Sequence, residues 1–152
     1  MEKFEPKIKN INDFESRRNS GFVVCFPEEF EIPSWGVRWI SNPVYTMIGK
    51  KGKWENIEIN FIDFIVEPIS DKLLKVINRL ENIEKKMISN HLFKITIKFI
   101  DPVDYIVGTW EIGVKEIVSI DFGAFNYASN NVLREVKMII APGYICTLPE
   151  KK

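Results

Sequence analysis

The stretch that decides the fold is WEIGVKEIVSIDFGAFNYASNNVLREVKMII, residues 110–140. Apolar and polar residues alternate on both sides of the turn-rich segment GAFNYASNN, residues 123–131, as they do in half-buried strands. Several strand-like segments precede this stretch, and a single helical pattern interrupts them. We therefore expect a mainly β fold, either a β-sandwich or a partly closed barrel, with one flanking helix.

The strands are expected from alternating patterns that end at proline, glycine or asparagine. FKITIKF, residues 93–99, is the clearest, because phenylalanine and isoleucine alternate with lysine and threonine until Asp101 and Pro102 end the pattern. NIEINF, residues 56–61, alternates in the same way. The other candidates are GFVVCF at 21–26, WGVRWI at 35–40, DYIVGTWEI at 104–112, KEIVSIDF at 115–122 and LREVKMIIA at 133–141, the last closed by Pro142 and Gly143.

The helix is expected to begin near Pro68, with Ser70 as its N-cap. Apolar residues recur at helical spacing over about 18 residues, which is typical of an amphipathic helix that covers a sheet. These residues are Leu73, Val76, Ile77, Leu80, Ile83 and Met87.

The length of 152 residues indicates one domain. Residues 1–19 are charged and weakly patterned, so we expect a flexible N-terminal arm, followed by a single β domain at 20–148 and a short tail at 149–152. No segment approaches the roughly 20 consecutive apolar residues of a membrane span. Cys25 and Cys146 are expected to be reduced thiols, since their spacing fits no metal site.

Charge and composition argue against an enzyme or a nucleic-acid-binding protein. The 21 basic and 21 acidic residues cancel, which leaves no electrostatic reason for tight binding to DNA or to an anionic membrane. His91 is the only histidine and has no evident catalytic partner, and the acidic pairs Asp63 with Glu67 and Asp101 with Asp104 lie at strand ends, where carboxylates commonly serve as turn residues. We expect no catalytic residue, no cofactor and no metal.

Two further features point to surfaces. GKKGK, residues 49–53, is expected to form a solvated loop between a strand ending near Tyr45 and another starting at Trp54. The polar positions Asn56, Glu58 and Asn60 are compatible with a strand that lines a water-filled barrel or with an ordinary solvated sheet face. The four tryptophans are expected to fill the core or a subunit interface, because base stacking also requires a basic groove; they are Trp35, Trp39, Trp54 and Trp110.

In its order of elements the sequence resembles the tail tube proteins of contractile-tailed bacteriophages. A tryptophan-bearing strand, the acidic-aromatic turn SIDFG at 119–123, the S-N-N turn and the final strand LREVKMII follow one another as in that family. The opening GFVVCFPEEFEIPSWGVRWISNPVY, residues 21–45, is also similar, with two strands joined by a proline-containing segment. The resemblance covers about residues 20–146; the basic GKKGK loop and the charged arm have no close counterpart in it.

The resemblance implies a structural protein whose six copies form a ring, with rings stacked into a tube through which phage DNA passes without sequence-specific binding. The implied partners are further copies of the chain, the tail sheath and the baseplate, and the implied location is a virion tail assembled in the host cytoplasm. By position, Asn56, Glu58, Asn60, Glu135 and Lys137 are lumen candidates. The inter-ring loop candidates are Gly49, Lys50, Lys51, Gly52, Lys53 and Trp54.

Two alternatives remain at this point. A baseplate tube-initiator or tail-terminal ring of the same fold forms one ring and does not polymerise. A β-barrel that binds a small apolar ligand in a pocket lined by phenylalanine and tryptophan belongs to a different class, and it is expected to be monomeric.

Overall fold

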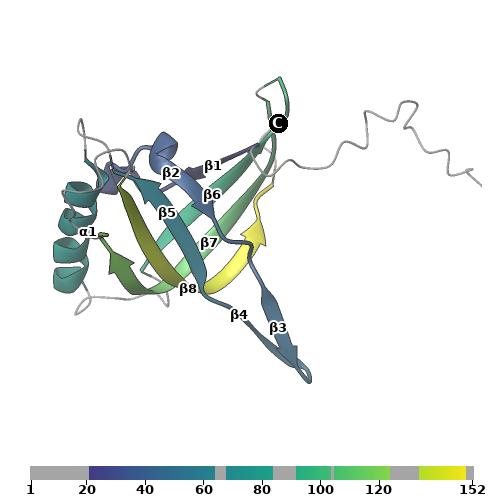
Figure 1. Cartoon of the computed structure of the whole chain (residues 1–152). Helices are drawn as coiled ribbons and strands as arrows, with labels where there is room; N and C mark the ends of the chain where they lie inside the picture. The colour runs from purple at the N-terminus through teal and green to yellow at the C-terminus, as the bar shows by residue number, and fades with distance from the viewer. Residues whose placement is uncertain (1–20, 64–67, 84–91, 104, 124–133, 150–152) are drawn as a thin grey trace, which may run out of the picture.

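The computed structural model describes residues 21–63, 68–83, 92–103, 105–123 and 134–149. The predicted N-terminal arm, the turn at 124–131, His91, Glu67 and Asp104 lie outside these residues. One six-stranded antiparallel sheet forms the body, in the order β1-β6-β7-β8-β5-β2 (Figure 1). Its strands are β1 (Phe22–Cys25), β2 (Val37–Ile40), β5 (Ile57–Ile62), β6 (Phe93–Ile100), β7 (Ile106–Asp121) and β8 (Glu135–Thr147).

The sheet curves into a nearly closed barrel. Its two edge strands approach each other because β1 contacts the short 3-10 helix Ser34–Gly36, which leads directly into β2. A second 3-10 helix, Glu28–Phe30, lies in the same connection and contacts α1 (Ile69–Ile83). The helix covers one side of the barrel, and the separate hairpin of β3 (Tyr45–Ile48) and β4 (Lys51–Trp54) projects away from it (Figure 1). The partly closed barrel with one flanking helix is thus confirmed.

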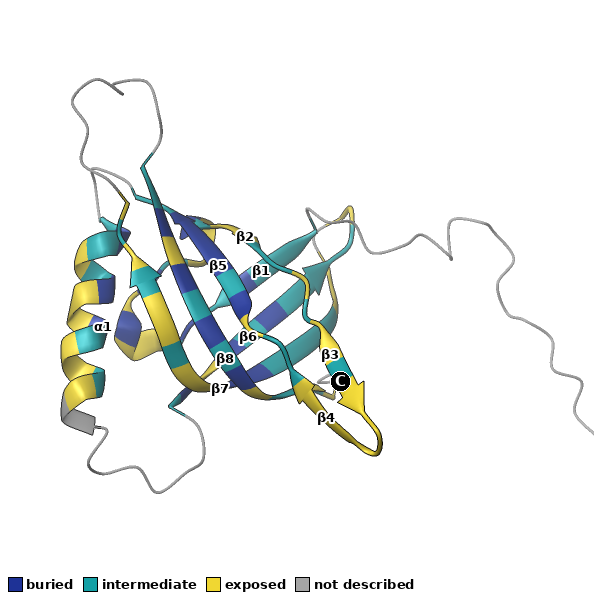
Figure 2. Cartoon of the chain, turned by 60° about the horizontal axis from the view of Figure 1, so that its bottom comes forward, coloured by how far each residue is buried: buried dark blue, intermediate teal, exposed yellow. Residues whose placement is uncertain are grey.

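A continuous core fills the concave side of the sheet. Inward and outward residues alternate along the strands as predicted, which gives the banding in Figure 2. On α1 the buried residues are Ile69, Leu73 and Val76. They join side chains from the strands and the connecting segments in one cluster, which includes Val24, Phe26, Phe30, Ile57, Ile59, Phe61, Phe93, Ile95, Ile97, Ile112, Val114, Val136, Met138 and Ile140.

The two longest strands differ from our prediction. We expected separate strands at 104–112 and 115–122, but β7 is one strand of 16 residues. We also expected the final strand to end before Pro142 and Gly143, but β8 passes through them and has 13 residues. The chain can continue because the pairing of β7 with β8 shifts register next to Gly113 and Val114, opposite Pro142. Such a β-bulge accommodates a proline, which lacks a backbone N–H, and bends both strands.

The start of α1 also differs. Ser70 is not the N-cap; it lies inside the helix, which begins at Ile69. Its backbone N–H donates to Asp63 Oδ1 at 3.2 Å and its hydroxyl to Oδ2 at 2.8 Å. Asp63, at the end of β5, therefore caps the helix from a distance. Asp63 is thus structural, as we predicted, but it is a nearly buried helix cap and not a solvated turn residue.

The GKKGK segment is a hairpin, not the loop we predicted. Tyr45 pairs with Trp54 and Ile48 with Lys51, so strand pairing continues up to a two-residue turn at Gly49 and Lys50. Gly49 has φ of 65°, and a glycine at the first central position favours the tight type II′ turn. Only the predicted exposure of the lysines is correct.

Replacing Val136 by Asp should unfold the protein or destabilise it by at least about 3 kcal/mol, because Val136 is fully buried in the core and a carboxylate there has no partner. Lys137→Asp is the control, since Lys137 is exposed on the opposite face of the same strand. Denaturant unfolding followed by circular dichroism measures both. Similar stabilities for the two variants would show that the faces of β8 are assigned in reverse.

Candidate assembly surfaces

The convex side of β5 and β8 forms a polar face. Glu58 and Asn60 alternate with the core residues of β5, and Lys137, which pairs with Asn60, alternates with those of β8. Glu135 lies on the same face, opposite Ile62, and Asp121 of β7 pairs with Lys137. Glu58, Glu135 and Lys137 thus share one surface, and the fourth candidate, Asn60, is directed to the same side but is buried. Asn56 precedes β5, is exposed, and lies at the base of the β3–β4 hairpin.

An ionic cluster organises this polar face. Asn60 is only 1% exposed, and its Nδ2 donates to Glu135 Oε2 at 3.3 Å. The Arg38 guanidinium, on β2, donates to the other Glu135 oxygen and forms an ion pair with it. The cluster therefore ties together the three adjacent strands β2, β5 and β8. Sequence reasoning missed Arg38, because no spacing rule indicates that β2 pairs with β5.

A second cluster fixes the end of the polar face to the helix. Arg134 donates from Nε and Nη2 to the backbone carbonyl of Phe122 at 3.1 and 3.0 Å. Its Nε also lies 3.8 Å from Asp63 Oδ2, the oxygen that accepts from Ser70. The end of β7, the start of β8 and the start of α1 are therefore held by one carboxylate and one guanidinium.

The β3–β4 hairpin has two unlike faces. Tyr45, Met47 and Trp54 lie on one face, where the Tyr45 and Trp54 rings are 5.0 Å apart and Tyr45 covers Gly52. Lys51 and Lys53 lie on the other face beside Thr46 and Ile48. Met47 is 65% exposed and Ile48 is 76% exposed. The hairpin thus presents a combined apolar and basic surface to solvent.

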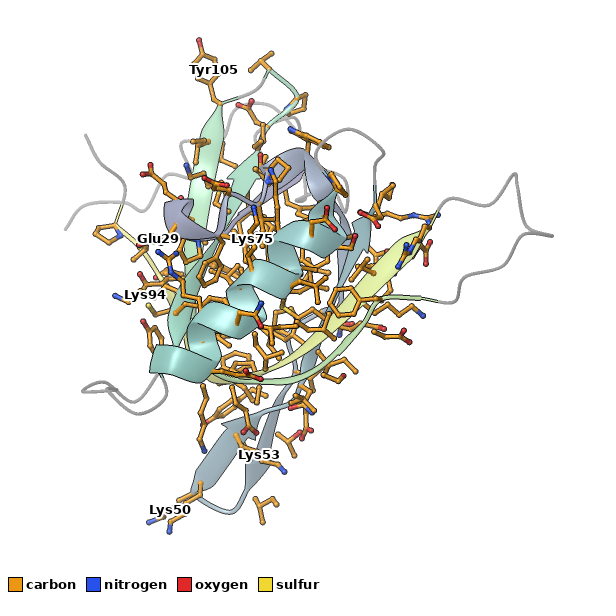
Figure 3. The ribbon with its side chains drawn as sticks, turned by 90° about the vertical axis from the view of Figure 1, so that its left-hand side faces the viewer. Glu29, Lys50, Lys53, Lys75, Lys94 and Tyr105 are labelled. Atoms are coloured by element: carbon orange, nitrogen blue, oxygen red, sulfur yellow. The ribbon has the colours of Figure 1, made fainter. Side chains whose placement is uncertain are left out.

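A second exposed apolar group lies at the turn between β6 and β7. Asp101 Oδ1 accepts hydrogen bonds from the backbone N–H groups of Val103 and Tyr105, both at 2.9 Å, which confirms the structural role predicted for this aspartate. The turn exposes Val103, Tyr105, Ile106 and Val107. Tyr105 and Lys50 point away from opposite ends of the molecule (Figure 3).

A groove separates the hairpin from the bend of β7 and β8. It has a volume of about 740 Å³ and is open to solvent; Tyr45 and Trp54 line it on one side, Lys115 and Pro142 on the other. Tyr144, also in its lining, donates from its hydroxyl to Glu111 Oε2 at 2.8 Å. Burial, the hydrogen bond to Glu111 and the negative charge of Glu111 raise the pKa of Tyr144 to about 12.

Among the residues that the structure describes, no three histidine, cysteine, aspartate or glutamate side chains are grouped as a metal ion requires. None of the helices described is long and apolar enough to cross a membrane.

The comparisons with known proteins match the chain to solved structures but to no family model. Neither the protein-family models nor the curated proteins include a match to this sequence. Among solved structures, the chain matches one from the extended-state sheath-tube complex of an extracellular contractile injection system, PVC, with 16% identity and a TM-score of 0.60, over 95% of this chain and 99% of that one. The fold is that of a contractile injection system component.

A chain of the anti-feeding prophage (AFP) baseplate is also similar, with 13% identity and a TM-score of 0.48, over 84% of this chain and 90% of that one. The resemblance to contractile-tail proteins that the order of elements indicated is confirmed at the level of the fold by the PVC match. In the sequence, this resemblance was indicated by the order of strands, one helix and further strands.

Asn60→Asp should lower the unfolding free energy by about 2 kcal/mol at pH 7, because it places a second carboxylate beside Glu135 in a buried position. Burial and Glu135 both raise the pKa of the new carboxyl group, so the loss should shrink as the pH falls and that group becomes protonated. The exposed Asn56→Asp variant is the control. A loss of unfolding free energy that does not depend on pH would contradict the interaction between residue 60 and Glu135.

Gly113→Ala should destabilise the bend by about 1–3 kcal/mol, because the added Cβ would lie 2.1 Å from Cε1 of Tyr144. Gly143→Ala is the control, since its Cβ would meet only ordinary contacts at 3.5 Å and beyond. In a Tyr144→Ala background the cost of Gly113→Ala should disappear. Chemical denaturation of the four variants measures this, and a cost that persists would mean that the backbone, not the tyrosine ring, requires glycine.

Proposed function

We propose that the chain is a structural tube subunit of a contractile tail or injection system, six copies of which form a ring and whose rings stack into a tube. The observation that carries the proposal is the fold match to the PVC sheath-tube complex, which extends over nearly the whole of both chains. Because the match extends over nearly the whole of both chains, it supports the same kind of assembly for this chain.

The polar convex face supports a lumen lining. Its positive groups, Arg38 and Lys137, are set among Glu58, Glu135 and Asp121, so the face has no continuous basic surface. A polymer can pass along such a surface without adhering to it. DNA as that polymer follows from the phage resemblance alone. The predicted location in a virion or virion-like tail rests on the same argument.

The sheath and baseplate partners are assigned to other surfaces. The outer side of α1 is charged and exposed, with Asp71, Lys75, Arg79 and Glu81. Lys75 and Glu29 flank a smaller pocket of about 330 Å³ between α1 and the 3-10 helix Glu28–Phe30 (Figure 3). A tube that slides inside a sheath needs a weak, polar contact of this kind rather than a large apolar one.

A tube subunit is favoured over a tail-terminal ring. Exposed apolar residues are present at both ends of the molecule, around Met47 and around Tyr105. A tail-terminal ring needs such a surface only at the end that meets the tube, whereas a tube-initiator ring, which contacts both the tube and the baseplate, also needs two.

A small-ligand barrel is less well supported. The concave side of the sheet, where such a ligand would bind, holds the buried core side chains, and the 740 Å³ groove is open and partly lined by charged residues. We assign a structural rather than an enzymatic role because the fold match is to a chain of a sheath-tube complex.

The purified protein should assemble into rings with six times the 17.7 kDa mass of one chain, and the rings should stack into hollow tubes as concentration rises. Light scattering coupled to size-exclusion chromatography gives the mass, and negative-stain electron microscopy gives the shape. Single rings at every concentration would favour the tube-initiator or tail-terminal alternative. A monomer at every concentration would favour the ligand-binding barrel.

A further inference from the structure

The open groove between the β3–β4 hairpin and the bend of β7 and β8 is lined by three aromatic side chains. Tyr45 comes from β3, Trp54 from β4 and Tyr144 from β8, so strands of two different sheets contribute the rings. The volume of about 740 Å³ is within the roughly 300–1,000 Å³ of sites that hold a small ligand. The surfaces assigned above to the lumen and the sheath do not use these rings.

Two of the rings are held by contacts within the hairpin. The Tyr45 ring lies against Gly52, where a Cβ would be only 2.4 Å from the ring carbon Cζ. Its centroid is 5.0 Å from that of Trp54, at an interplanar angle of 60°. Tyr45 is nevertheless 48% exposed, so part of a ring with a fixed orientation remains open to a ligand.

The third ring is fixed from the body of the barrel. Tyr144 lies over Gly113 of β7, and its hydroxyl donates to Glu111 Oε2 at 2.8 Å. An aromatic ring that covers a glycine on a neighbouring strand stabilises a sheet. Here the same arrangement also holds an aromatic ring in the wall of the groove.

The charged side chains that line the groove balance one another. Lys53 and Lys115 are offset by Glu55 and Glu116, and Asn56 adds an amide. A ligand with a strong charge of either sign would meet a like charge in this lining, which disfavours it. A neutral ligand with many hydroxyl groups finds both hydrogen-bond donors, from the lysines and the amide, and acceptors, from the carboxylates.

The aromatic rings set a second requirement on the ligand. The face of an aromatic ring is negatively polarised and attracts positively polarised C–H groups. A sugar of the gluco configuration carries its hydroxyls around its edge and its C–H groups on its two flat faces, so it can stack on a ring and hydrogen-bond to polar side chains together. β-1,4 linkages join such units into a straight chain, which suits a groove open to solvent. Partly open barrels of the OB-fold also bind oligosaccharides.

We infer that the groove binds a neutral β-1,4-linked oligosaccharide of gluco-configured units. Tyr45, Trp54 and Tyr144 are the stacking platforms, and the lysine, glutamate and asparagine side chains around them bind the hydroxyls. The inference goes beyond the proposed structural role and does not depend on ring formation.

Titration of the purified chain with two neutral probes and one acidic probe tests the ligand class. The neutral probes are cellohexaose and chitohexaose, and the acidic probe is a hyaluronan hexasaccharide. Isothermal titration calorimetry follows each probe up to about 10 mM, above the dissociation constant of a weak complex. At least one neutral probe should bind saturably, and the acidic probe should bind about tenfold more weakly or not at all.

Substitutions of the platform residues locate the binding. Trp54→Ala and Tyr45→Ala should each weaken binding of the neutral probe by about tenfold or more, whereas Trp54→Phe, which keeps a ring, should lose less. Trp35→Ala is the matched control, since Trp35 is 57% exposed but does not line the groove, and it should bind as the unmodified protein does. Circular dichroism checks that each variant is folded. Tyr45 is half-exposed and outside the core cluster, so Tyr45→Ala gives a readout even if Trp54→Ala does not fold.

Absence of saturable binding by both neutral probes would overturn the inference. Tighter binding of the acidic probe would also overturn it, because the groove would then act as a cationic site. Binding of a neutral probe that both Trp54→Ala and Tyr45→Ala leave unchanged would place the sugar elsewhere and refute the site. None of these results bears on ring formation, which light scattering and electron microscopy measure separately.

Discussion

The structure depends on the bent pairing of β7 with β8. Two strands of 16 and 13 residues would make a long flat ribbon if they paired regularly. Register shifts beside Gly113 and Val114, opposite Pro142, bend the pair, and Tyr144 lies over Gly113 where any side chain would collide with it. Curvature of this kind is what converts an open sheet into a barrel. The core, the polar convex face and the groove all follow from that bend.

The same bend separates the molecule into surfaces with different chemistry. Core residues such as Val136 and Met138 occupy the concave side, while Asn60, Glu135 and Arg38 form an ionic cluster on the convex side. The hairpin and the β6–β7 turn extend to opposite ends (Figure 3). A subunit of a tube needs a wet face, a sheath-side face and two unlike ends, and we propose that the polar convex face, the outer side of α1 and the two projecting ends serve these roles.

The sequence was sufficient to predict those elements that a local residue pattern determines. Alternation in FKITIKF correctly predicted β6, helical spacing correctly predicted α1, and the succession of strands, one helix and further strands correctly predicted the fold. Prediction from the sequence failed where pairing between strands distant in the sequence overrides the local residue pattern. Pro142 and Gly113 are strand breakers in isolation, but the bulges of β7 and β8 accommodate them. Arg38 joins Asn60 and Glu135 only because β2, β5 and β8 are neighbours, and Asp63 replaces Ser70 as the helix cap only because β5 ends beside α1.

The most direct measurement of the central claim is a cryo-electron microscopy reconstruction of the assembled protein at a resolution that shows side chains. We predict six-fold rings in which Glu58 and Lys137 face the lumen and α1 faces outward. A reconstruction in which the convex face of β5 and β8 lies on the outside, or in which the particles are isolated monomers, would contradict it.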